Sequence, residues 1–170
     1  MKNLVLIISI ATLGYACNKM DTVSPEVKSG YTIVNNGNAA LKEITDTADH
    51  DALKIDQAIP SVANQTYFSN MPIMFFMNDK LYLNSIYDNV EITENGIKAK
   101  GTIAVNEAAN GNAIITFTPT TPFAVNKLIS ITIKKEIRDD GGNKMTADFV
   151  MTYTTKEPST VMFDDNKDFE

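Results

Sequence analysis

Two short segments carry oxygen-bearing side chains in spacings that could coordinate a divalent cation. The first is the run Asp-Asp-Gly-Gly-Asn at 139–143, where the oxygens come from Asp139, Asp140 and Asn143. Calcium prefers such ligands, and extracellular modules often bind it weakly. The same residues also supply the positive φ angles that a tight hairpin turn needs. We therefore favour a turn over a calcium site here.

The second segment is the acidic C-terminal tail, residues 158–170. Asp164, Asn166 and Asp168 alternate as oxygen ligands do at the start of an EF-hand loop. Phe169, however, occupies the position where that loop requires Gly, and no bidentate Glu follows. We expect a solvated acidic tail, with no metal ion and no cofactor bound to the protein.

The chain has few side chains that commonly act as catalytic nucleophiles or as general acids and bases. The one histidine is His50, and the one cysteine is Cys17. Catalysis by His50 would need a partner group within hydrogen-bond reach, and no local pattern supplies one. The sequence contains no nucleophile elbow, no phosphate-binding glycine loop and no zinc-ligand spacing. It therefore predicts a protein that is not an enzyme.

Aromatic side chains offer a possible binding chemistry. Tyr67, Tyr82 and Tyr87 lie in or near predicted loops, and aromatic rings can stack on sugar faces or anchor protein interfaces. The alternative is that these rings fill the ends of the core. The chain contains no Trp, which weakens the case for a dedicated glycan-binding platform.

The first seventeen residues have the organisation of an export signal. Lys2 precedes an apolar run at 4–13, and the small residues Gly14 and Ala16 lead to Cys17. The run is about half the length that a membrane-spanning helix needs. The segment resembles bacterial lipoprotein signals, which implies that Cys17 receives a diacylglycerol and then becomes the acylated N-terminus, with acyl chains such as palmitate. The alternative is ordinary cleavage after Ala16, which would release a soluble protein.

Charge limits the range of partners. Removal of the signal that precedes Cys17 takes away one basic residue of 15 and none of the 21 acidic ones, so the mature chain has a formal charge of 14 − 21 = −7. A chain this acidic is a poor ligand for nucleic acid. No thiol follows Cys17, so the fold must be stabilised by packing rather than by disulfides.

The elements that would position these residues are mostly strands. Residues 18–52 are predicted to form a tether and a partly ordered segment, with β propensity at 31–34 and a short helix at 39–44. From residue 53 to 157, apolar residues recur with period two between turn signals about ten residues apart, which is typical of an all-β sandwich. The predicted strands are 53–59, 72–77, 89–93, 98–105, 113–118, 128–137 and 146–155.

The domain from 59 to 155 resembles the bacterial Ig-like domain typified by surface-layer proteins. The matching segments are Pro60 with Ala63, Pro72-Ile73, Met77-Asn78-Asp79, Thr116-Phe117-Thr118-Pro119, Pro122-Phe123-Ala124, 139–143, and Tyr153-Thr154-Thr155. This resemblance implies a seven-stranded Ig-like β-sandwich. A fold does not fix a function by itself.

These observations predict a lipoprotein of the outer membrane that faces the periplasm or the cell surface. Its partners would be the membrane, through the N-terminal lipid, and an envelope protein or glycan, but no nucleic acid. We expect a non-catalytic binding, spacer or structural module. The alternative is a carbohydrate-binding or accessory subunit of a polysaccharide-handling surface complex.

Overall fold

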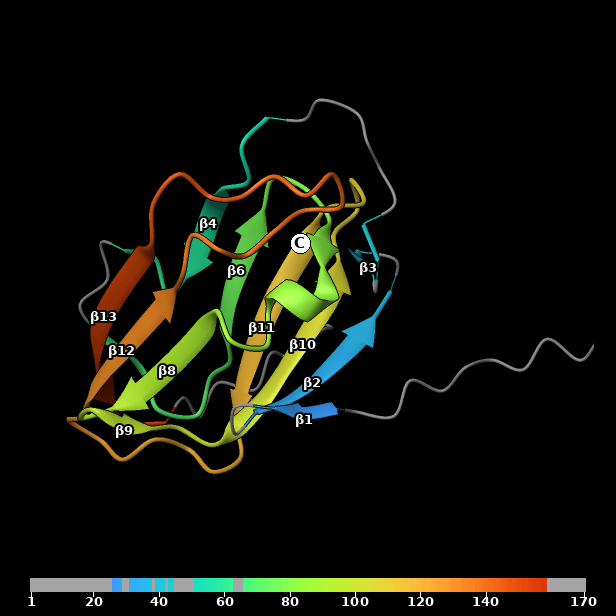
Figure 1. The fold of residues 1–170 in the computed structure, drawn as a ribbon. Coiled ribbons are helices and arrows are strands. Elements are labelled where there is room, and N and C mark those ends of the chain that lie inside the picture. The colour runs from blue at the N-terminus through green and yellow to red at the C-terminus, as the bar shows by residue number, and fades with distance from the viewer. Residues whose placement is uncertain are drawn as a thin grey trace, which may run out of the picture.

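Two β-sheets packed face to face form most of the protein in the computed structural model (Figure 1). The structure describes residues 26–28, 31–37, 39–41, 43–44, 51–62 and 66–158. The six-stranded sheet has the order β1-β2-β10-β11-β6-β4. Its strands are β1 (Glu26–Lys28), β2 (Tyr31–Asn36), β10 (Gly101–Glu107), β11 (Ala113–Pro119), β6 (Ile73–Met77) and β4 (Ile55–Ile59).

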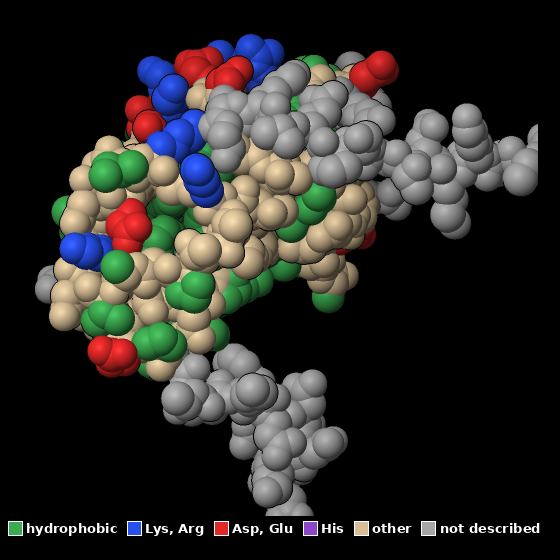
Figure 2. Space-filling model, turned by 90° about the horizontal axis from the view of Figure 1, so that it is seen from below, with side chains coloured by type: hydrophobic (Ala, Val, Ile, Leu, Met, Phe, Trp, Pro, Cys, Tyr) green, Lys and Arg blue, Asp and Glu red, His purple; other side chains and the backbone are tan. Residues whose placement is uncertain are grey.

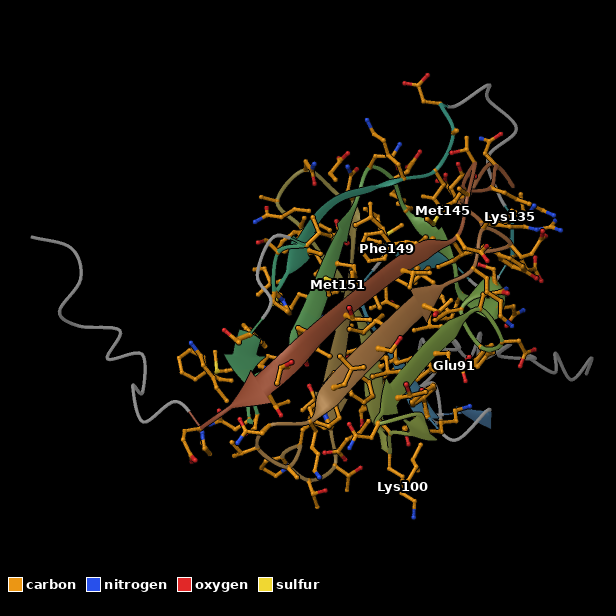
Figure 3. The ribbon with its side chains drawn as sticks, turned by 90° about the vertical axis from the view of Figure 1, so that its left-hand side faces the viewer. Glu91, Lys100, Lys135, Met145, Phe149 and Met151 are labelled. Carbon is orange, nitrogen blue, oxygen red and sulfur yellow. The ribbon has the colours of Figure 1, made fainter. Side chains whose placement is uncertain are left out.

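The five-stranded sheet has the order β5-β13-β12-β8-β9. Figure 3 looks onto this sheet, where β13, β12 and β8 lie side by side. Its strands are β5 (Thr66–Phe68), β13 (Phe149–Lys156), β12 (Leu128–Ile133), β8 (Val90–Glu94) and β9 (Ile97–Lys98). A separate two-stranded pair joins β3 (Ala40–Leu41) to β7 (Leu81–Tyr82), and one 3₁₀ turn, η1 (Leu83–Ser85), follows.

Alternation within the strands builds the core between the two sheets. Ile73, Phe75 and Met77 of β6 are buried, as are Ile129, Ile131 and Ile133 of β12. Successive side chains of a strand point to opposite faces, so each of these triplets lines one side of the core. The period-two pattern of the sequence predicted both triplets, and the structure confirms them.

The predicted all-β sandwich is confirmed, but the predicted number of seven strands is wrong. In the described residues the two sheets contain eleven strands. One reason is that the predicted strand 98–105 is split between the sheets. Ile97 and Lys98 pair with β8, whereas the chain from Gly101 onward pairs with β11. A β-carbon at Gly101 would lie 2.4 Å from the Phe117 ring, so this crossing point requires glycine.

The last two strands are shorter than predicted. β12 ends at Ile133 because the chain then turns, with Lys134 N–H donating to Asn89 O (2.8 Å) and Ile137 N–H donating to Lys134 O (3.2 Å). β13 begins at Phe149, so the first three residues of the predicted strand 146–155 lie outside it, and Ala147 is exposed. The alternation of apolar and polar residues in the sequence therefore extends beyond the residues that pair with a neighbouring strand.

The segment before residue 53 contributes to the sheets. β2 pairs in parallel with β10 over six residues, and Tyr31 and Ile33 are buried in the core. The predicted helix at 39–44 is wrong where the structure describes it, because Ala40 and Leu41 pair with Leu81 and Tyr82. Local helix propensity is weak, and tertiary pairing overrides it here.

Tyr31 joins the two sheets directly. Its hydroxyl donates to Ile92 O (3.1 Å) and accepts from Ile92 N–H (2.8 Å), across from β2 to β8. Its ring packs edge-on against Phe117, with 5.7 Å between centroids. Burial raises the pKa of this hydroxyl, the hydrogen bond to Ile92 opposes that shift, and Glu91 adds to it. The N-terminal strand is therefore part of the folded unit.

Candidate functional site

Several predicted site residues lie outside the described part of the chain. These are the acylation candidate Cys17, the tail residues Asp164, Asn166 and Asp168, and the lone histidine His50. Their roles stay predictions. Within the described residues, no group of three or more His, Cys, Asp or Glu side chains is placed to hold a metal ion.

The turn at 139–143 uses its own oxygens. Asp139 Oδ1 accepts from Asn143 N–H (2.7 Å), and Asp139 Oδ2 accepts from the Asn143 side-chain amide (3.1 Å). The Asp139 N–H donates to Asn143 O (3.0 Å), and Gly142 has φ +89°. Asp139 and Asp140 are both buried. The Asp139 carboxylate that a calcium ion would need is thus already bound within the turn.

The three candidate tyrosines belong to different parts of the fold. The Tyr67 hydroxyl donates to Pro72 O (3.3 Å), its ring packs edge-on against Tyr153, and burial raises its pKa. Tyr87 is buried at 5% exposure. Tyr82 is half-buried, and its hydroxyl accepts from the Asn84 amide (3.2 Å). Tyr67 and Tyr87 therefore pack into the core rather than forming a flat ring platform.

The outer face of the six-stranded sheet is unusual because its described strands carry no charge at the positions that alternate away from the core, although Asp56 is exposed at the bulge of the edge strand β4. We call this surface the neutral face. On β2, β10, β11, β6 and β4, every side chain that alternates away from the core is uncharged. These side chains are Thr32, Val34, Asn36, Thr102, Ala104, Asn106, Ile114, Thr116, Thr118, Met74, Phe76, Ile59 and Gln57.

Strand register divides the neutral face into two halves. In one half, Thr116 pairs with Met74, Ile114 pairs with Phe76, and Met74 pairs with Ile59. This places four large apolar side chains together, each of them partly exposed: Ile59, Met74, Phe76 and Ile114. The sheet thus presents an apolar patch to its outer side.

The other half of the neutral face is polar and internally hydrogen-bonded. The Asn36 amide donates to Asn106 Oδ1 (3.0 Å), and the Asn106 amide donates to Thr116 Oγ1 (3.0 Å). These bonds join side chains of β2, β10 and β11 across the sheet. This half is neutral because its side chains are uncharged amides and hydroxyls, and their hydrogen bonds link three strands.

The outer face of the five-stranded sheet differs in composition. Hydroxyl side chains line its central strands, at Thr93, Ser130, Thr132, Thr152 and Thr154. Charged side chains accompany them: Glu91 stands on β8, and Lys156 lies 4.1 Å above the Phe68 ring. Leu128 and Val150 are exposed singly at 51% and 62%. This surface is that of an ordinary solvated sheet.

Charge is also distributed unevenly at the end of the sandwich. Figure 2 shows most of the charged side chains clustered at the top of the view from below, with a few at its left and a central surface that is neutral or apolar. A cavity of about 310 Å³ is lined by both signs of charge, with Asp88 and Glu91 beside Lys98 and Lys134. It contains no nucleophile paired with a base, so it offers ion pairing rather than covalent chemistry.

A second cavity, of about 320 Å³, lies between the edge strand β4 and the start of β13. It is lined by Ile55, Asp56, Gln57, Ala58, Ser61, Val62 and Phe149. Phe149, labelled in Figure 3, packs edge-on against Phe75 with 5.7 Å between centroids. The cavity opens at the side of the sandwich, where two sheet edges meet.

The described part of the chain has no helix long and apolar enough to cross a membrane.

The sequence analysis did not predict the neutral face. A signal for it existed, however, because β6 reads Ile-Met-Phe-Phe-Met and is apolar on both of its faces. Strands with two apolar faces are typical of sheets that are covered on both sides.

Comparison with known proteins gives one family match. The model of the family described as "Bacterial Ig-like domain" matches residues 49–155. No curated protein matches the chain.

Solved structures give low similarity over the domain. "Crystal structure of the S-layer protein rSbsC(31-844)" has 14% identity and a TM-score of 0.44, covering 64% of this chain and 14% of that one. "Structure of surface layer protein SbsC, domains 1-6" has 14% identity and a TM-score of 0.45, with the same coverage. The chain therefore spans about one seventh of the length of these proteins.

Proposed function

The chain belongs to the bacterial Ig-like domain family, and on that premise we propose that it is a non-catalytic module of the cell envelope that acts through its neutral face. The observation that supports this most is the absence of charge from that face on a protein with a formal charge of −6. Depletion of charge, together with Met and aromatic side chains, is the composition that marks the centre of protein interfaces.

The proposal that the module is non-catalytic is supported by the composition of the described residues. They contain neither His nor Cys, since the one residue of each type lies outside them. The buried carboxylate of Asp139 is hydrogen-bonded within its own turn. A binding, spacer or structural role needs only a stable scaffold and an exposed surface, and the sandwich supplies both.

The anchor in this proposal is a lipid on Cys17. The first described strand begins at Glu26, so residues 18–25 separate the anchor from the sheet. Eight residues span at most about 28 Å when fully extended. Because β1 and β2 belong to the six-stranded sheet, the domain would be held near the membrane rather than at the end of a 35-residue tether.

Labelling with an alkyne analogue of palmitate tests the anchor. Wild-type protein should incorporate the label and fractionate with the outer membrane, and Cys17→Ala should do neither. If wild-type protein stays unlabelled and soluble, the lipid anchor is wrong. Protease treatment of intact cells then assigns the side of the membrane: release of peptides from 59–155 indicates the cell surface, and protection indicates the periplasm.

A second candidate function is carbohydrate binding within a polysaccharide-handling surface complex. The observation that favours it is the amide ladder of Asn36 and Asn106, which shares the neutral face with the Phe76 ring. Amides and one aromatic ring can bind a neutral sugar. Affinity electrophoresis with neutral polysaccharides tests this idea, because Asn106→Ala and Phe76→Ala should each abolish retardation that the wild type shows. A wild type without retardation rules the idea out.

A further inference from the structure

We propose that the outer edge of β13 binds an extended segment of a partner polypeptide, which adds to the five-stranded sheet as a further strand. This site is separate from the neutral face, so its test is independent of the function proposed above. Three properties of the described residues support it: backbone groups that no strand pairs, an edge without the features that prevent pairing, and an apolar cavity beside that edge.

The strand β13 is longer than the strand that covers its outer side. β12 pairs with residues 149–154 on one side, whereas β5 pairs only with residues 154–156 on the other. In the described part of the chain, residues 149–153 therefore have no strand partner on the side away from β12. Figure 3 shows this part of β13 beyond β12, with Phe149 and Met151 labelled.

The backbone groups of two residues point out of the sheet along this stretch. Thr155 N–H donates to Lys127 O on the β12 side (2.9 Å). Neighbouring residues of an antiparallel strand direct their N–H and C=O groups to opposite sides. Val150 and Thr152 differ from Thr155 by an odd number of residues, so their groups point away from β12. An extended polypeptide has N–H and C=O groups at the spacing that matches them.

The other sheet edges have features that discourage strand addition, and this one does not. The outer strand β4 has a register shift between Ile55 and Gln57, and the charged Asp56 stands at that shift. β1 has three residues and β9 has two. Bulges, charges and short strands are the means by which sheets avoid edge-to-edge pairing. Residues 149–153 carry no charge, no proline and no register shift against β12.

The cavity of about 320 Å³ beside β4 lies on the inner side of this edge, because Phe149 lines it together with β4 residues. A strand added next to β13 would lie over β4, and its inward side chains would face the cavity. Ile55, Ala58 and Val62 form apolar parts of the lining, and Val62 is 67% exposed. In strand addition, pockets for alternate side chains select the partner. The segment bound here should therefore place an apolar side chain such as Leu in the cavity.

A labelled peptide of sequence Ser-Val-Thr-Leu-Thr-Val-Ser with blocked ends tests the proposal. It is titrated against the chain from residue 18, and binding is followed by fluorescence anisotropy. Two N-methylated peptides are matched to it, one methylated at both Thr residues and the other at both Val residues. These two sets of amides face opposite edges of an extended peptide. We expect one set to weaken binding at least tenfold and the other to leave it unchanged.

Hydrogen exchange measured by nuclear magnetic resonance places the bound peptide. The amides of Val150 and Thr152 should exchange at least tenfold more slowly when the peptide is bound. The amide of Met151 is the internal control, because it faces β12 and should not change. A shift in protection to β1 or β4 would put the peptide at a different edge and overturn the proposal.

A pair of exposed aliphatic residues shows whether the cavity contributes. Val62→Glu places a carboxylate in the lining of the cavity and should weaken peptide binding at least fivefold. Ile97→Glu is the matched control on β9, at the opposite edge of the sheet, and should leave binding unchanged. Both side chains are exposed, and a melting temperature within a few degrees of the parent establishes that each variant is folded.

Equal effects of the two N-methylated sets would overturn the proposal, because binding through a strand edge must distinguish them. Absence of binding at peptide concentrations up to about 1 mM would also overturn it. None of these results affects the lipid anchor, which palmitate labelling tests separately, and none involves the neutral face. Failure of this site and failure of the envelope assignment are therefore distinguishable.

Discussion

The two sheets of this protein have similar inner faces and different outer faces. Inside, both contribute buried Ile and aromatic side chains to one core. Outside, the five-stranded sheet carries hydroxyl side chains with Glu91 and Lys156 among them, whereas the neutral face of the six-stranded sheet carries Met74, Phe76 and an amide ladder. The inner faces form the core that stabilises the fold. The different composition of the outer faces is not needed for that core, so it indicates a role of the neutral face other than stability.

The inner faces of the two sheets should contribute comparably to the stability of the core. Phe117 of the six-stranded sheet and Ile131 of the five-stranded sheet are both fully buried. We expect Phe117→Ala to reduce the free energy of unfolding by about 3–5 kcal/mol and Ile131→Ala by about 2–5 kcal/mol, through lost burial and cavity formation. Urea denaturation measures both. A nearly neutral effect at either position would mean that one sheet does not contribute to a common core.

The next largest effect tests how the N-terminal strand joins the sheets. Tyr31→Phe removes the hydroxyl that accepts from Ile92 N–H and donates to Ile92 O, while Ile92 O keeps its hydrogen bond from Ala99 N–H (2.9 Å). Leaving the buried Ile92 N–H without a partner should cost about 1–3 kcal/mol of stability. Tyr82→Phe is the control, because the Tyr82 hydroxyl bonds only to an exposed Asn84 amide, and surface changes cost within about 0.5 kcal/mol. Similar losses in both variants would contradict the role given to Tyr31.

The smallest effect is expected at an exposed ion pair that follows the five-stranded sheet. The Lys144 ammonium donates a hydrogen bond to Glu136, and this bond, followed by the charge of Lys144, lowers the pKa of Glu136. A lowered pKa stabilises the fold above the carboxyl's ordinary value and loses that effect as pH falls through the folded value. Glu136→Gln should lower the melting temperature slightly at pH 7 and not at pH 3. A larger loss at pH 3 would contradict this sign.

Much of the sandwich could be predicted because its signals are local. Alternation over 73–77 and 128–133 indicates the buried triplets, and the dipeptide Asn95-Gly96 is typical of a tight turn and has positive φ at both residues. The division of 98–105 between two sheets could not be predicted in this way. Both halves have strand-like composition, and only pairing with β8 or β11 decides which sheet each joins.

The candidate site was harder to predict than the fold. Sequence reasoning weighed Tyr67, Tyr82 and Tyr87 because single aromatic residues are conspicuous. In the structure Tyr67 packs against Tyr153 at the margin of the core, and Tyr87 is buried. The neutral face consists of residues that are individually unremarkable. It becomes a surface only when five strands from different parts of the chain are placed in register.

The sequence by itself determined which residues of each strand face the core, because a strand alternates its side chains over neighbouring residues. It also determined the acidic charge and the composition of each turn. Only the tertiary structure decided that residues before 53 add strands to the sheet and that Asn36 lies beside Asn106. These contacts join segments seventy residues apart. Such pairings depend on the register between strands, and no local pattern encodes that register.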